Sequence, residues 1–274
     1  RRASGGGILM TDYASIHQPV LLEQCVSLVA PALQDPGSIA VDCTLGLAGH
    51  TIAFLKAAPQ ARVLGIDRDA EALAMATERI AGEGLSDRFI PVHAAFDAFG
   101  QVLDDQGIDR VNAVFMDLGL SSLQIDETDR GFSYAHDAPL DMRMDSSDNI
   151  DAWFIVNRWP QEKIERILRD YGEEKFAARI AAKIAERREQ QEIKTTFELV
   201  DVIKSAMPAA ALREKQHPAK RSFQAIRIAV NDELNAVHAL MDSAPDRLKP
   251  GGRLCVISFH SLERSEERRV GKEC

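Results

Sequence analysis

The residues best placed to do chemistry begin with a glycine-containing loop. In VDCTLGLAGHTIAFL (residues 41–55), Gly46 and Gly49 follow an apolar stretch that predicts a strand and precede a helical pattern. Such a loop brings backbone N–H groups and a helix N-terminus close to an anionic ligand, and glycine is needed where a Cβ would hold the ligand away. A tight strand-to-helix turn that binds nothing would give the same pattern.

A carboxylate at the end of the next predicted strand favours ligand binding. Asp67 ends RVLGID (62–67), about 20 residues after the loop, where doubly wound domains place the acid that accepts ribose hydroxyls. Asp67 could instead be a solvated strand end or a helix cap, although Asp69 is better placed for that cap. Together the loop and Asp67 indicate an adenosine-containing ligand.

The glycine spacing discriminates among such ligands. A dinucleotide site needs Gly-x-Gly-x-x-Gly, and only Gly46 and Gly49 are present here, which disfavours NAD. S-adenosylmethionine presents only a carboxylate at this position, and a shorter loop can hold it. Asp117 ends a later predicted strand and would lie across the same crevice. There it could meet the ammonium group of the ligand or orient a nucleophile; the alternative is a cap or a structural acceptor.

The elements that position these residues predict an α/β core. Apolar stretches typical of buried strands alternate with helical patterns in the first half of the chain. The predicted strands are 38–41, 62–67, 89–94, 112–119 and 253–259, and the predicted helices before the fourth strand are 19–33, 50–58 and 70–82. Because strands and helices alternate, we expect a parallel sheet.

A helical module is predicted between the fourth and fifth strands. Residues 135–218 contain helical spacing and no convincing strand, and Thr195 and Glu198 form a predicted capping box. Residues 222–248 read as one long helix, and KPGG (249–252) reads as a turn. The expected segments are a core in two parts, an all-helical insertion and a tail: 10–134 and 219–263, 135–218, and 264–274.

Composition limits the functional classes. The chain has 274 residues, a net charge of -9 and four cysteines without metal-site spacing, so we expect no zinc, no disulfide framework and a cytoplasmic location. No apolar run is long enough to cross a membrane. The acidic balance argues against indiscriminate nucleic-acid binding, but a basic cluster lies at 211–227. Its candidates for phosphate contact are Lys220, Arg221 and Arg227, which could equally form a solvated helix face.

Eight ordered motifs carry a resemblance to a known family. They are HQPVLLEQ (17–24), DCTLGLAGHT (42–51), GIDRDAEAL (65–73), MDLGLSSLQID (116–126), RGFSY…PLDMRMD (130–145), YGEEKFAARIA (171–181), HPAKRSFQAIRIAVNDEL (217–234) and PGGRLCVISFHSLE (250–263). The sequence resembles the RsmH (MraW) family of ribosomal RNA small-subunit methyltransferases. The resemblance implies a class I (Rossmann-like) methyltransferase sheet interrupted by an inserted helical domain. It also implies methylation of N4 of a P-site cytidine of 16S rRNA, within the small ribosomal subunit.

The resemblance also implies the residues that contact S-adenosylmethionine. They are Ala48, Gly49, His50, Asp67, Phe96, Asp117 and Gln124, with Phe96 packing against the adenine. The family usually has two glycines before the histidine, whereas this chain has Ala48 and Gly49. If residue 48 needs a positive φ, alanine there costs about 1 kcal/mol.

Methyl transfer to cytosine needs acceptors for the amino N–H groups, because the amino lone pair is delocalised into the ring. DLGLSS (117–122) occupies the place of the motif of DNA amino-methyltransferases but lacks its prolines and its aromatic residue. The catalytic candidates are therefore Asp117, Ser121 and Ser122. Phe259 could stack on a flipped base or belong to the core, and His260 is expected to be structural.

Two rival functions stay open, and one defect is expected. The rival functions are an NAD(P)-linked oxidoreductase and a non-catalytic RNA-binding or ribosome-assembly factor on a methyltransferase-like fold. A class I sheet normally continues for two more strands, and RSEERRVGKEC (264–274) is too charged to supply a buried strand. We therefore expect truncated C-terminal strands, an open edge at 253–259, and a homodimer or other self-association, with weak cofactor binding and poor methylation.

Overall fold

Five parallel strands form one sheet in the order β3-β2-β1-β4-β5. The computed structural model describes residues 19–121, 124 and 128–263. The strands are β1 (Ile39–Asp42), β2 (Arg62–Asp67), β3 (Phe89–His93), β4 (Val111–Asp117) and β5 (Leu248–Ile257). Neighbours of β1 in the sheet are β2 and β4, so the winding direction reverses at β1. In open parallel sheets, a crevice for ligands lies at the carboxyl ends of the strands at this reversal.

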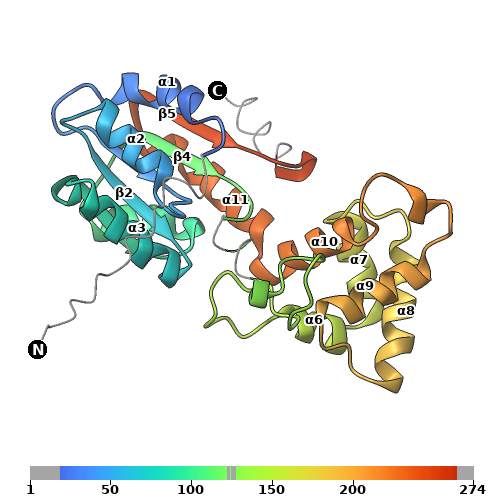
Figure 1. Ribbon diagram of the computed structural model, residues 1–274. Coiled ribbons are helices and arrows are strands. Elements are labelled where there is room, and N and C mark those ends of the chain that lie inside the picture. The colour runs from blue at the N-terminus through green and yellow to red at the C-terminus, as the bar shows by residue number, and fades with distance from the viewer. Residues whose placement is uncertain (1–18, 122–123, 125–127, 264–274) are drawn as a thin grey trace, which may run out of the picture.

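Helices cover both faces of the sheet (Figure 1). On one face lie α1 (Leu22–Val29), α2 (Gly49–Ala57) and α3 (Ala70–Gly82), whose apolar side chains share a core cluster with Phe115. On the other face lie α4 (Phe99–Asp105) and α11 (Glu233–Ser243), which pack around Met116. Because both faces are covered, the three inner strands β2, β1 and β4 are almost wholly buried and apolar, as predicted, whereas the edge strands β3 and β5 are partly exposed. We call these strands and helices the sheet lobe.

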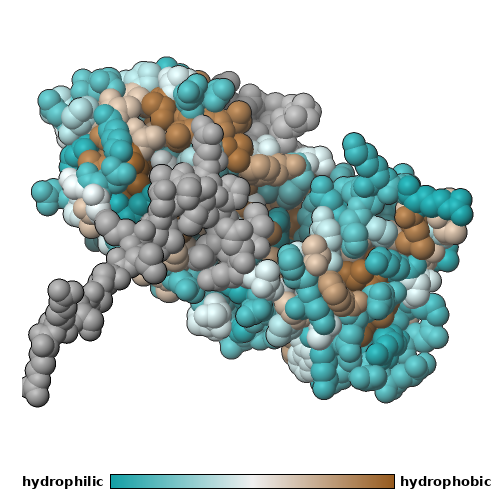
Figure 2. Space-filling view, viewed as in Figure 1, coloured by the Kyte–Doolittle hydropathy of each residue, from teal (hydrophilic) through white to brown (hydrophobic). Residues whose placement is uncertain are grey.

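The remaining labelled helices form a separate hydrophobic cluster, which spans residues 132–230 and which we call the helical lobe. They are α6 (Ala152–Arg158), α7 (Gln161–Asp170), α8 (Ala177–Gln190), α9 (Thr196–Ala206) and α10 (Lys220–Asn231). The predicted capping box of Thr195 and Glu198 is confirmed at the start of α9. In Figure 2 the visible surface of this lobe is mostly hydrophilic, and the larger hydrophobic areas lie on the sheet lobe.

Short 3-10 turns connect several of these elements. They are Ala30–Leu33, Ser86–Arg88, Phe96–Ala98, Thr128–Arg130, Ala211–Arg213 and Pro245–Arg247. The first of them shortens the helix expected at 19–33, because α1 itself ends at Val29. None of the described helices is both long and apolar enough to span a membrane.

The single long helix expected at 222–248 is wrong. The chain leaves helical geometry at Asp232, whose φ of 52° is left-handed, and α10 and α11 are separate helices on either side of it. Aspartate tolerates this conformation better than most residues. Phe223 and Ile226 of α10 pack in the helical lobe, past the predicted boundary at residue 218. The predicted domain limits themselves remain predictions.

Residues 249–252, expected to form a turn before the strand, instead lie within β5 at a break in its pairing with β4. Leu248 pairs with Val111 and Arg253 pairs with Ala113, so the intervening residues bulge out of register. Gly251 accommodates the bulge with a φ of 78°. Among the described residues β5 ends the sheet. The tail 264–274, on which the expectation of truncation rests, lies outside the described residues.

Candidate functional site

A cavity of about 300 Å³ opens at the carboxyl ends of β1, β2 and β4. It lies where the sheet topology places a ligand crevice. Of the seven predicted cofactor residues, six line it: Gly49, His50, Asp67, Phe96, Asp117 and Gln124. Gly46, Ser121 and Phe259 line it as well. Residues distant in the sequence therefore meet as the sequence analysis predicted.

The loop after β1 is held in a left-handed conformation at two positions. Gly46 has a φ of 49° and Ala48 a φ of 60°. The expected condition for strain at Ala48 is thus met, and its buried side chain packs in the sheet-lobe core instead of lining the cavity. A Cβ on Gly49 would lie 2.4 Å from Cγ of Pro19. Glycine fits there because any larger side chain would clash with the ring of Pro19, which lines the cavity.

Asp67 fixes this loop from the end of β2. Its Oδ2 accepts a hydrogen bond from the N–H of Gly46 at 2.8 Å, and its Oδ1 accepts one from the N–H of Asp69 at 2.9 Å. Burial raises the pKa of Asp67, although these two hydrogen bonds oppose the shift. Asp69 caps α3, as the sequence predicted. Because an ionised carboxylate has about four acceptor sites, Asp67 keeps capacity for hydroxyl groups of a ligand.

Asp117 and His50 lie next to each other in the cavity wall. Oδ2 of Asp117 lies 3.9 Å from Nδ1 of His50, and Oδ1 is buried with no hydrogen-bond partner among the described residues. Burial raises the pKa of Asp117 to about 6; the charges of Asp42 and Glu263 add to the shift, and His50 opposes it. Burial lowers the pKa of His50.

The tautomer of His50 follows from its other nitrogen. Nε2 lies 3.0 Å from the carbonyl oxygen of Val20, so Nε2 must carry the hydrogen that this bond needs. In the neutral ring Nδ1 is then a lone-pair acceptor that faces the carboxylate of Asp117. Two acceptors facing one another favour a ligand that brings N–H donors, such as an ammonium or an amino group.

Phe259 lies at the cavity on a segment that Glu263 holds in place. The side chain of Phe259 is 59% exposed, so its interpretation as a core residue is wrong. Oε2 of the buried Glu263 accepts hydrogen bonds from the N–H groups of Phe259 at 2.8 Å and of His260 at 3.3 Å. Nε2 of His260 lies 3.1 Å from Oε1 of Glu263, and His260 is absent from the cavity lining. This arrangement fits the structural role expected for His260.

Ser121 and Gln124, which both line the cavity, exchange two hydrogen bonds. The N–H of Ser121 donates to Oε1 of Gln124 at 3.1 Å, and the N–H of Gln124 donates to Oγ of Ser121 at 3.3 Å. The hydroxyl hydrogen of Ser121 stays available to a ligand in this geometry. Ser122, the other serine candidate, lies outside the described residues.

None of the three basic candidates lines the cavity, and they differ in their surroundings. Lys220 is exposed at the start of α10, and Arg221 donates to the carbonyl oxygen of Glu173 at 2.7 Å. Arg227 is only 15% exposed and makes two bonds, of 2.9 and 3.0 Å, to Glu233. Its guanidinium is thus engaged inside the protein, which favours a structural role over phosphate contact.

Arg68 and Glu263 also line the cavity, and the sequence did not predict either. The one sequence feature that could have indicated Arg68 is its position directly after Asp67. In the described part of the chain, no group of three or more His, Cys, Asp or Glu residues could hold a metal ion.

Comparisons with known proteins place the chain in a family. Residues 14–273 match the model of the MraW methylase family. The chain is 59% identical to a ribosomal RNA small subunit methyltransferase H of Bifidobacterium adolescentis, covering 93% of this chain and 74% of the relative. It is 51% identical to one of Thermobifida fusca, covering 94% and 77%. A solved rRNA methylase of Streptococcus thermophilus is more distant, with 23% identity, a TM-score of 0.31 and coverage of 38% and 53%. The chain therefore belongs to the MraW methylase family.

Proposed function

We propose that the chain transfers a methyl group from S-adenosylmethionine to the N4 amino group of a P-site cytidine of 16S rRNA, in the small ribosomal subunit. Membership of a methylase family supports methyl transfer, and the names of the relatives support small-subunit rRNA as the substrate. The observation that carries the proposal is the pair of facing acceptors, Asp117 and His50, at the cavity wall. Their chemistry suits an amino group.

The residues of the cavity fit the cofactor. Asp67 would accept the ribose hydroxyls, the Gly46–Gly49 loop would face the methionine carboxylate, and the half-buried Phe96 would pack against the adenine. A volume of about 300 Å³ is at the lower end of the usual range for small-molecule sites. Bound there, S-adenosylmethionine supplies a methyl group on a sulfonium, which is already activated for displacement. The protein then has chiefly to orient the nucleophile.

Asp117 is the group best placed to act on that nucleophile. Its unpartnered Oδ1 can accept an amino N–H, which favours pyramidal geometry at nitrogen, and the carboxylate can take up the proton that leaves. A pKa of about 6 keeps Asp117 ionised at neutral pH, yet closer to a useful base than an ordinary aspartate. Phe259, exposed at the cavity, would stack on the cytosine ring.

The test uses labelled S-adenosylmethionine and small subunits isolated from cells that lack this methylation. After the reaction the rRNA is digested to nucleosides, and we expect the label in N4-methylcytidine. Asp117→Ala should remove transfer even at saturating S-adenosylmethionine. Because Asp117 is also a predicted cofactor contact, the affinity of this variant for labelled cofactor is measured alongside. Label in another nucleoside would disprove the N4 assignment. Binding of subunits without any transfer would favour the non-catalytic factor, and binding of NADH instead of S-adenosylmethionine would favour the oxidoreductase.

A further inference from the structure

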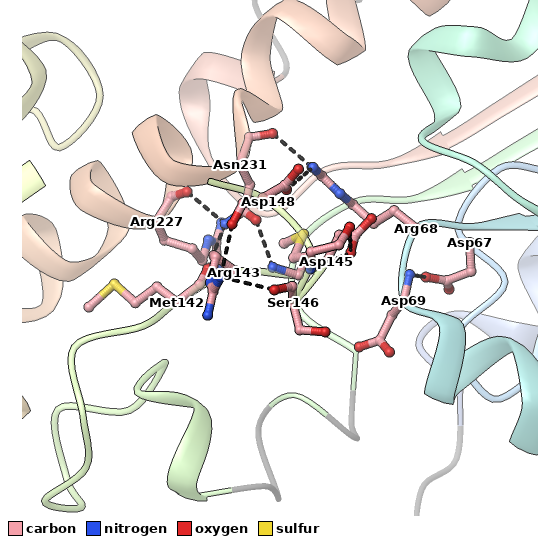
Figure 3. A network of polar contacts seen from close by, with 12 residues as sticks. Asp67, Arg68, Asp69, Met142, Arg143, Asp145, Ser146, Asp148, Arg227 and Asn231 are labelled. Atoms are coloured by element: carbon pink, nitrogen blue, oxygen red, sulfur yellow. Dashed lines mark hydrogen bonds and ion pairs between the residues drawn. The ribbon is translucent and has the colours of Figure 1, made fainter. Parts of the chain in front are cut away.

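A network of polar contacts joins the end of β2 to the helical lobe (Figure 3). Arg68, next to Asp67, donates through Nη1 to the carbonyl oxygen of Asn231 at 2.8 Å and through Nη2 to Asp148 at 2.9 Å. Asn231 is the last residue of α10. Its buried side-chain amide donates to the carbonyl oxygen of Met142, and its Oδ1 accepts from the N–H of Met144. Arg68 thus binds both Asn231 and the 142–148 segment, and Asn231 is itself hydrogen-bonded to that segment.

A second arginine makes a parallel connection. Arg130 donates to Oδ2 of Asp69 at 2.5 Å, and also to the carbonyl oxygens of Arg143 and Met144 at 3.0 and 2.9 Å. The N–H of Asp69 in turn donates to Oδ1 of Asp67. Arg68 is therefore bonded directly to residue 148, and Asp69 is linked to residues 143 and 144 through Arg130.

Part of the cavity wall comes from the segments on which these arginines act. Met144, Glu233 and Leu234 all line the cavity. Glu233 begins α11, immediately after the left-handed Asp232, and its carboxylate is bonded to Arg227 of α10. A displacement of α10 relative to the sheet would therefore break the Arg68 contacts and also move this wall.

We propose that Arg68 is a positioning residue that couples occupation of the cofactor cavity to the placement of the helical lobe. This inference rests on the proposed function, because it assigns RNA contact to the lobe that carries Lys220 and Arg221. A ligand held by Asp67 and by the wall residues stabilises the arrangement in which Arg68 reaches Asn231 and Asp148. The placed lobe then presents its basic residues to RNA in one fixed relation to the cavity. By thermodynamic reciprocity, bound RNA must strengthen cofactor binding by the same factor.

The experiment measures that factor directly. The affinity for labelled S-adenosylhomocysteine, which carries no transferable methyl group, is determined with and without saturating small subunits. For the wild type we expect subunits to tighten binding by about 5-fold or more. In Arg68→Gln and in Asp148→Asn the factor should fall towards one, and the KM for subunits at saturating cofactor should rise more than kcat falls.

The control and the contrary outcomes separate this inference from the proposed function. Arg158→Gln removes an ion pair with Glu192 elsewhere on the helical lobe and should leave the factor unchanged. If Arg68→Gln and Asp148→Asn keep the wild-type factor while the wild type methylates subunits, the inference is overturned and the proposed function stands. If subunits do not tighten cofactor binding to the wild type at all, the inference is likewise overturned and the proposed function stands. If Arg68→Gln does not fold, Asp148→Asn decides, because its carboxylate is partly exposed and nearly the same shape as the amide.

Discussion

Oδ2 of Asp117 and Nδ1 of His50 face each other at 3.9 Å, while Nε2 of His50 is bonded to the carbonyl oxygen of Val20. This geometry leaves two acceptors opposed when the ring is neutral and the carboxylate ionised. Such an arrangement disfavours the folded protein at neutral pH until a donor or a proton joins the pair. It is therefore testable through stability as well as through activity.

The first prediction concerns Asp117→Asn and pH. Between the ordinary value of 3.8 and the folded pKa of about 6, the folded protein holds a proton that the unfolded chain has released, so this contribution to stability is lost as pH rises. Asparagine avoids the loss. We expect the variant to equal the wild type near about pH 4 and to exceed it above about pH 7, by at most about 3 kcal/mol. Urea unfolding across this range is the measurement, and a pH-independent difference would contradict the prediction.

Asp141→Asn provides a control of opposite sign. Burial would raise the pKa of Asp141, but hydrogen bonds from Arg143 outweigh it and lower that pKa. The ionised form of Asp141 therefore stabilises the fold above the unfolded pKa, and the contribution disappears as pH falls through the folded pKa. We expect this variant to be less stable than the wild type at neutral pH and to approach it under acid conditions.

The second prediction concerns Asp67→Ala. The substitution removes the acceptor expected for the ribose and also releases the N–H of Gly46. Loss of a charged acceptor should weaken S-adenosylmethionine binding by about 2–3 kcal/mol, roughly 30- to 150-fold. Calorimetry measures the affinity, and Asp87→Ala, at an exposed carboxylate before β3, serves as the control. Equal affinities for Asp67→Ala and wild type would remove Asp67 from the site.

The third prediction compares two glycines of similar conformation. Gly131 and Gly84 have φ values of 74° and 69°, but a Cβ at Gly131 would lie 2.3 Å from the carbonyl oxygen of Pro139, whereas Gly84 faces open space. Gly84→Ala should cost about 1 kcal/mol of stability from backbone strain alone. Gly131→Ala should cost clearly more, because backbone atoms near Arg130 must move. Similar unfolding midpoints for the two variants would contradict the prediction, because they would show that the backbone around Gly131 can move at little cost.

The fourth prediction separates the basic residues. Lys220→Glu with Arg221→Glu should impair methylation of subunits and flatten its salt dependence, while cofactor affinity stays near wild type, because each phosphate contact contributes to the salt slope. Lys56→Glu with Arg62→Glu, at two exposed positions on α2 and β2 of the sheet lobe, is the matched double charge reversal. Arg227→Glu should instead lower stability, since it opposes the part-buried Glu233. Normal turnover by the Lys220 and Arg221 double variant at every salt concentration would mean that these two residues form only a solvated face.

The sequence predicted best what local chemistry decides. Strands of a covered parallel sheet are rich in apolar residues, and all five strands are confirmed to within a few residues, apart from the longer start of β5. The helix at 70–82 is confirmed at both ends, with Asp69 as its cap. The cavity residues came together because the loops after parallel strands share one edge of the sheet.

Long-range bonds decide what the sequence did not predict. Nothing local marks the break at Asp232, which is stabilised by the contacts of Asn231 with Met142 and Met144, far away in the chain. Arg227 looks like a surface base in the sequence, because its partner Glu233 meets it only where the helix breaks. The role of Glu263 likewise depends on a turn after β5 that periodicity does not reveal.

The hydrogen bond from the N–H of Phe259 to the buried Glu263 lowers the entropy that stacking on Phe259 would cost. An exposed aromatic ring on a loose loop would lose its freedom only when a partner arrives, and that loss would weaken the complex. Here the backbone beneath the ring is already immobilised when the chain folds, so a flat partner meets a surface that is prepared for it. The ring then starts from one fixed point of the backbone, and only rotation about its two side-chain torsions remains to be lost when a partner stacks on it.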